Sequence, residues 1–123
     1  MEIYKINAFD EWAKEYNVSD EILLDAIREM SNGLFDANLG GNVYKKRIPL
    51  DNKGKRGGAR TILAFKFNDK TFFIYSFAKN KQANVNEKEL KALKKLAKVY
   101  LGLTDKEIID ALRTGNLIKV DIK

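Results

Sequence analysis

Cysteine and histidine are both absent from this sequence. Their absence excludes disulfide frameworks, zinc fingers and every catalytic site that depends on a cysteine nucleophile or a histidine base. Apolar residues never run for the ~18 positions that a membrane-spanning helix needs. The N-terminus carries Glu2 ahead of any apolar stretch, which is not the layout of a signal peptide. We therefore expect a cytoplasmic protein with no membrane contact.

The composition is that of one folded domain. The chain has 123 residues, of which 45% are hydrophobic and only one is proline. A chain of this length buries roughly 65% of the surface that it exposes when unfolded, which is enough for one core. No repeat or linker divides the sequence, so we expect a single domain over residues 1–123.

Positive charge is concentrated in one short segment. The net charge is +6, but residues 1–41 carry −6, residues 42–60 carry +6 and residues 61–123 carry +6. A segment as dense in cations as residues 42–60 is typical of a surface that binds a polyanion, most often nucleic acid. A solvated basic loop without a ligand is the alternative.

Hydrophobic spacing and capping residues indicate a strand and two helices in the first third of the chain. Residues 1–7 alternate as a strand, and Asn7 followed by Asp10 resembles a helix cap. Ser19 begins a second helix, which should end at Gly33.

The middle of the chain is rich in strand signals. A glycine-containing loop at residues 39–42 leads into a strand at residues 43–48, which Pro49 closes. Residues 60–67 and 70–78 are two β-rich runs separated by a short turn, which predicts a hairpin. We expect the aromatic side chains of this hairpin to be core and sheet surface.

The last third returns to helices. Asn86 and Glu89 form a capping box that opens a lysine-rich helix to residue 100, residues 104–112 form a shorter helix, and residues 117–122 alternate as a final strand. The whole pattern predicts an α+β domain in which N-terminal and C-terminal helices pack on an antiparallel β-sheet.

The basic residues of the central segment fall where a sheet could gather them. Lys45 and Arg47 are two apart and share one face of their strand, whereas Lys46 points to the other face. Residues 52–60 combine three glycines, which let a backbone approach a ligand closely, with four cations. The loop is not a Walker A motif, because GxxxxGK[ST] is absent.

Three segments occur in a specific order: KKR at residues 45–47, GKRGGARTI at residues 54–62, and FAKN at residues 77–80 before the lysine-rich helix. Their order and spacing resemble the toxins of RelE/HigB-like type II toxin–antitoxin systems over nearly the whole chain. The resemblance implies the RelE-like microbial RNase fold and cleavage of mRNA on the ribosome, in the 30S A site. It also implies a cognate antitoxin, usually a helix-turn-helix protein.

Family ribonucleases drive the attack of a ribose 2′-OH on the adjacent phosphate, which requires alignment, proton transfer and relief of negative charge. Lys55 is the leading candidate for the base, because the cations Lys53, Arg56 and Arg60 around it would lower its pKa. By the resemblance, Arg60 contacts the scissile phosphate and Lys79 stabilises the developing charge or the leaving group. A tyrosine, the ribosome or the RNA itself remains open as the carrier of the proton.

The other polar residues of these segments are expected to bind RNA: Lys45, Lys46, Arg47, Lys53, Arg56, Asn80 and Lys81. Within residues 42–60 the only carboxylate is Asp51, which argues against a metal-dependent nuclease. We therefore expect a metal-independent endoribonuclease without a cofactor.

The chain departs from well-studied relatives at one point. Those relatives have an arginine where this chain has Asn80, and a tyrosine near residues 85–86, where this chain has valine and asparagine. Tyr75, with Tyr44 and Phe77 near it in the predicted sheet, keeps base stacking possible.

The alternative function is that of a non-catalytic nucleic-acid-binding module or of a ParE-like toxin, because the same superfamily includes toxins that poison DNA gyrase.

Overall fold

The computed structural model of this chain describes residues 1–50, 58–78, 82 and 84–121. In chain order the elements are β1 (Glu2–Ile6), α1 (Asn7–Glu15), α2 (Asp20–Ser31), β2 (Ala37–Gly40), β3 (Val43–Ile48), β4 (Ala59–Phe65), β5 (Lys70–Ala78), α3 (Glu87–Leu101), α4 (Asp105–Thr114) and β6 (Leu117–Lys119). Within these residues, no helix is long and apolar enough to cross a membrane.

The strands form one mixed sheet in the order β2-β3-β4-β5-β1-β6. The α+β class is confirmed, but the expected antiparallel sheet needs a correction, because β1 pairs with β5 in parallel. Alternation of apolar and polar residues predicts a strand but carries no information about its direction, so the sequence pattern could not show this pairing. The predicted hairpin is present as β4 and β5, which are antiparallel.

One strand was missed by the sequence pattern. Residues 39–42 were expected to form a loop, but Leu39 and Gly40 belong to the four-residue strand β2, which pairs with β3. Gly41 and Asn42 form the turn between the two strands, with φ angles of +61° and +63°. Positive φ at both central residues is what a type I′ hairpin turn requires. The loop prediction was therefore correct only for the turn.

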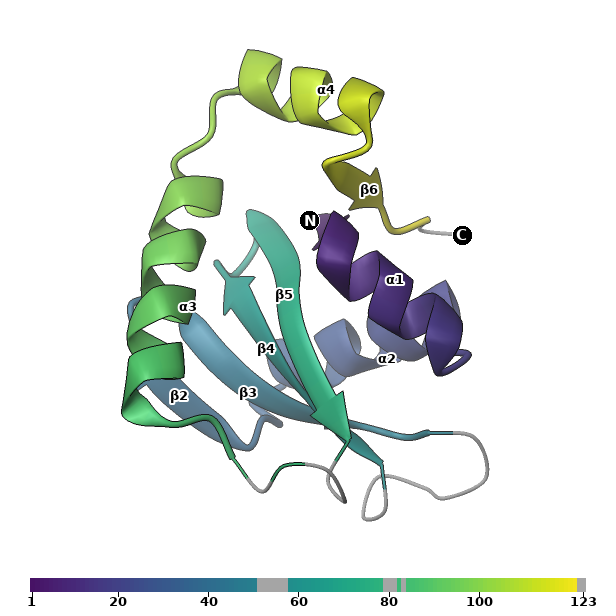
Figure 1. Cartoon of the computed structure of the whole chain (residues 1–123), viewed down its shortest axis with the longest axis vertical. Helices are drawn as coiled ribbons and strands as arrows, with labels where there is room; N and C mark the ends of the chain where they lie inside the picture. Colours follow the sequence, from purple (N-terminus) through teal and green to yellow (C-terminus); the bar gives the residue numbers. More distant parts are fainter. Residues whose placement is uncertain (51–57, 79–81, 83, 122–123) are drawn as a thin grey trace.

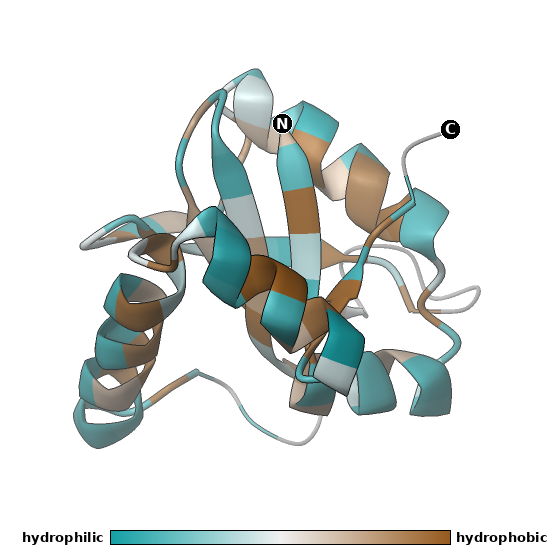
Figure 2. Cartoon of the chain, turned by 90° about the horizontal axis from the view of Figure 1, so that it is seen from above, coloured by the Kyte–Doolittle hydropathy of each residue, from teal (hydrophilic) through white to brown (hydrophobic). Residues whose placement is uncertain are grey.

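Helices cover both faces of the sheet (Figure 1). On one face Phe9 of α1 and Leu23 of α2 belong to a core cluster with Phe73 of β5. On the other face Leu93 of α3 packs in a second cluster with Phe72 of β5. Neighbouring residues of β5 thus point into different cores, as strand geometry demands. Bands of hydrophilic and hydrophobic residues alternate along the helices in Figure 2, because each helix has one face toward a core.

Most of the predicted helix starts are confirmed. The Ser19 side chain accepts a hydrogen bond from the backbone N–H of Ile22, and the capping boxes that open α3 and α4 are both complete. The cap predicted at Asn7 is wrong, because Asn7 is already helical and Ile6 occupies the N-cap position. The backbone N–H of Asn7 instead donates to the carbonyl of Asn116, which ties the start of α1 to the segment before β6.

A buried ion-pair network joins β1 to the two N-terminal helices. Lys5 is only 7% exposed, and its ammonium lies 2.8 Å from Asp10 of α1 and 3.2 Å from Asp20 of α2. Lys14 lies 3.1 Å from the second oxygen of Asp10, and Asp20 also accepts the backbone N–H of Asp121. A buried charge is tolerated only when it is paired in this way, so the network holds three elements in one arrangement.

Replacing Lys5 by alanine should lower the free energy of unfolding by about 3 kcal/mol, because Asp10 would lose its buried partner. Urea denaturation followed by circular dichroism measures the change. Lys106→Ala is the control, since Lys106 is exposed on α4. Equal stability of the Lys5 and Lys106 variants would show that the network contributes nothing.

The same network predicts how stability depends on pH. Burial alone would raise the pKa of Asp10, but hydrogen bonds from Lys5 and Lys14 outweigh burial and hold this pKa below its ordinary value of 3.8. The stabilisation by Asp10 is therefore present above pH 3.8 and is lost as the pH falls through the lowered value. The stability difference between the parent protein and Lys5→Ala should accordingly shrink in acid.

Candidate nucleic-acid interface

Cations and aromatic side chains form two neighbouring rows across β3, β4 and β5. Arg47, Arg60 and Phe77 stand opposite one another in the first row, and Lys45, Ile62 and Tyr75 do so in the second. Ile62 belongs to the core cluster beneath α3, so alternation places Lys45 and Arg47 of β3 and Arg60 of β4 on the α3 side of the sheet. The predicted juxtaposition of Lys45, Arg47 and Arg60 is thus present in the structure.

One carboxylate holds the two arginines together. Asp36, directly before β2, accepts the backbone N–H of Arg47 at 3.3 Å and the Nε–H of Arg47 at 2.8 Å. The same carboxylate oxygen lies 3.5 Å from Nε of Arg60. Two guanidinium groups on adjacent strands would otherwise repel each other, so Asp36 allows both to occupy one site. Guanidinium groups bind phosphates and carboxylates through the same fork of donors, and Asp36 faces only the Nε of each arginine.

Arg60 is the more buried of the two arginines. It is 8% exposed, and its Nη1 has no hydrogen-bond partner among the residues that the structure describes. A buried guanidinium donor without a partner is costly unless an anion satisfies it. Arg60 therefore retains hydrogen-bonding capacity for an anion at this end of the sheet.

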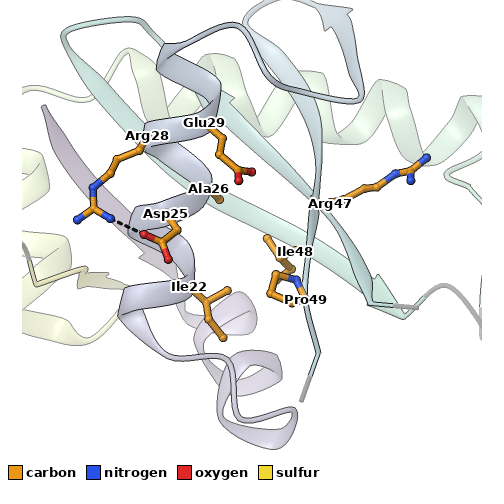
Figure 3. Close-up of a pocket in the computed structure, with 8 residues that line it drawn as sticks. All are labelled: Ile22, Asp25, Ala26, Arg28, Glu29, Arg47, Ile48 and Pro49. Carbon is orange, nitrogen blue, oxygen red and sulfur yellow. Dashed lines mark hydrogen bonds and ion pairs between the residues drawn. The ribbon is translucent and has the colours of Figure 1, made fainter. Parts of the chain in front are cut away.

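Lys46 has a different environment. As expected from alternation, it points to the opposite face, where it is 4% exposed and its ammonium lies 2.6 Å from Glu29 of α2. In Figure 3 the Glu29 side chain extends from α2 toward β3, whereas Arg47 leaves β3 on the side away from α2. The charge of Lys46 is buried and paired, so we no longer expect Lys46 to contact RNA.

Six of the expected site residues lie outside the described part of the chain: Lys53, Lys55, Arg56, Lys79, Asn80 and Lys81. In the sequence, residues 51–57 lie between β3 and β4, and residues 79–81 directly follow β5. The described ends of these strands carry Arg47, Arg60 and Phe77. The roles given to the six residues remain predictions.

The aromatic residues of the site are only partly those expected for base stacking. Tyr75 and Phe77 lie on one face, with ring centroids 6.0 Å apart. Tyr44 lies on the opposite face, where it packs against Phe35 and Phe65. Tyr44 therefore cannot stack on a base bound beside Arg60, which is a correction to the sequence-based expectation.

Tyr75 is held by Gln82, which no motif singled out, and through it by Glu89, which the sequence identified only as a helix-capping residue. Its hydroxyl donates to Gln82 at 3.2 Å, and the Gln82 amide donates to Glu89 at 3.3 Å. Burial first, and then the charge of Glu89, raises the pKa of Tyr75 above its ordinary value of 10.0. The phenol thus stays protonated at neutral pH, so it can donate a proton or a hydrogen bond but cannot serve as the base.

Comparison with known proteins identifies the family. The family model for the RelE toxin of the RelE/RelB toxin–antitoxin system matches residues 1–120. Among curated proteins the sequence finds no match. The family match covers nearly the whole chain, and the mixed sheet with helices on both faces agrees with a RelE-like fold. The chain therefore belongs to the RelE toxin family of toxin–antitoxin systems.

Proposed function

We propose that this toxin is a ribosome-dependent mRNA endoribonuclease that acts on mRNA in the 30S A site and so inhibits translation in the cytoplasm. The observation that supports this proposal most directly is the pair of arginines around Asp36, on the same face as Lys45 and Tyr75. Paired guanidiniums suit a phosphate, and a neighbouring aromatic ring suits an exposed base.

The proposed reaction is an internal transesterification. The ribose 2′-oxygen forms a bond to the adjacent phosphorus, the bond from phosphorus to the 5′-oxygen breaks, and the upstream product ends in a 2′,3′-cyclic phosphate. Lys55 takes the proton of the 2′-OH, Arg60 neutralises charge on the phosphorane, and Lys79 assists the leaving 5′-oxygen. Tyr75 positions a base or supplies a proton, since its phenol is protonated.

Membership of the family implies an antitoxin as the partner. We propose that this antitoxin is a helix-turn-helix protein encoded beside the toxin and that it neutralises the nuclease. The toxin then forms one domain over residues 1–123 and needs neither a metal ion nor another cofactor, because its own cations supply the charge.

Induced expression of the chain alone should arrest translation and leave transcripts cut within codons, and co-expression of the antitoxin should restore growth. Primer extension on cellular mRNA maps the cut sites. Normal growth with intact messages would contradict the proposal. DNA breaks without new RNA ends would instead indicate a gyrase-poisoning toxin.

A further inference from the structure

Helix α3 carries a second concentration of positive charge that the proposed reaction does not use. It contains five lysines: Lys88, Lys91, Lys94, Lys95 and Lys98. Leu93 and Ala97 face the core, and the spacing of Lys91, Lys94 and Lys98 puts these three together on another side of the helix. Within the described residues, no carboxylate lies at ion-pair distance from any of the five.

Four of these lysines line an open groove. The groove lies between α3 and the β2–β3 turn and has a volume of about 610 Å³. It is lined by Lys91, Lys94, Lys95 and Lys98, by Gly41 and Asn42 of the turn, and by Leu101 and Gly102 at the end of α3. None of the described residues that line it is acidic. Four like charges around one groove repel each other, so the arrangement favours an anionic ligand that neutralises them.

The turn brings the backbone close to the lysines. Gly40 has a φ of +88°, and a Cβ added there would lie 3.4 Å from the ammonium of Lys94. The Lys94 ammonium thus lies within contact distance of the β2–β3 turn, whose positive φ at Gly40 favours glycine. The groove is built by the type I′ turn and by one side of α3, so both of its walls belong to regular structure.

We infer that this groove binds the phosphodiester backbone of RNA at a second site, an inference that rests on the proposed function. Asn42 in the groove directly precedes β3 and is five residues from Arg47 in the first site, which corresponds to about 16 Å along an extended chain. One phosphate cannot reach both places. The second site thus contributes affinity for the RNA that carries the scissile bond or for the RNA that surrounds it.

The chemistry of the groove favours RNA over an acidic protein. Lysines are point charges that bind backbone phosphates without reading sequence. A protein partner would also need apolar contacts at the centre of its interface. Among the described residues of α3, the exposed Leu96 and Val99 do not line the groove, and the half-buried Leu101 is the one apolar side chain that does. A ligand in the groove therefore meets four lysine side chains for a single leucine.

The double variant Lys94→Ala/Lys98→Ala should bind fluorescein-labelled oligouridylate about tenfold more weakly at low salt. The slope of log K against log salt should become less steep by about 1.4, since each lost phosphate contact on a single strand contributes about 0.7. Fluorescence anisotropy across a salt series measures both quantities. The matched control is Lys106→Ala/Lys119→Ala, which removes the same charge from exposed residues of α4 and β6.

Three outcomes would overturn the inference: unchanged binding by the groove variant, an equal loss in the control, or competition by polyglutamate as effective as that by unlabelled oligouridylate. The last outcome would indicate an acidic protein partner. Binding of oligouridylate does not require cleavage, so the two proposals can fail separately. A chain that binds through the groove but never cuts translated mRNA would contradict the proposed function alone.

Discussion

Replacing Lys55 by alanine should slow the cleavage of translated mRNA by about 10²–10⁴-fold, which is the usual contribution of a general base. Histidine is absent from the chain, and the phenol of Tyr75 stays protonated at neutral pH, so neither can take the proton of the 2′-OH. A lysine among other cations remains the best candidate among the side chains.

Single-turnover cleavage on purified ribosomes measures this effect. In the Lys55→Ala variant, the plot of cleavage rate against pH should lose the rise that comes from deprotonation of the base. If Lys55 were purely structural, the shape of this plot would not change. Lys106→Ala on α4 is the control and should cleave at the rate of the parent protein. Full activity of Lys55→Ala would show that the ribosome or the RNA, and not Lys55, takes the proton of the 2′-OH.

Replacing Arg60 by alanine should reduce cleavage by about 10²–10³-fold, because a donor aimed at developing negative charge would be lost. Arg60→Lys should recover little of this activity, since an ammonium cannot provide the planar pair of donors of a guanidinium. The same ribosome assay measures both variants. The control is Arg113→Ala, whose side chain is 74% exposed on α4.

Arg60 is buried beside Asp36, so its variants need a test of folding as well. Arg60→Lys keeps a cation near Asp36, and its far-ultraviolet circular dichroism should match that of the parent protein. A folded Arg60→Lys with full activity would show that charge alone suffices. A folded Arg60→Ala variant with full activity would show that Arg60 takes no part in cleavage.

Local signals in the sequence predicted much of the fold. Ser19, the Asn86–Glu89 box and the turn between β4 and β5 each act within a few residues, so the sequence pattern contains them completely. The parallel pairing of β1 with β5 depends on a partner far along the chain and leaves no mark on the local pattern. Strand β2 pairs with its neighbour β3, but it has only four residues and an irregular register between Asn38 and Gly40, which is too little alternation to predict a strand.

The candidate site was predictable to the extent that it follows from alternation. Lys45 and Arg47 share a face with Arg60, and Lys46 points away from them, as the two-residue period requires. The pairing of Lys46 with Glu29, and the carboxylate of Asp36 between two arginines, arise from tertiary packing. Both acidic partners lie in the anionic first third of the chain, where no motif identified them.

We propose that this chain cuts mRNA on the ribosome with its own cations. The most direct test adds the purified protein to ribosomes that hold a defined codon in the A site, and maps the products by primer extension and end-group analysis. We expect a new 5′ end within that codon and a 2′,3′-cyclic phosphate on the upstream fragment, with both lost in Arg60→Ala. Intact mRNA after incubation with the folded parent protein would contradict it.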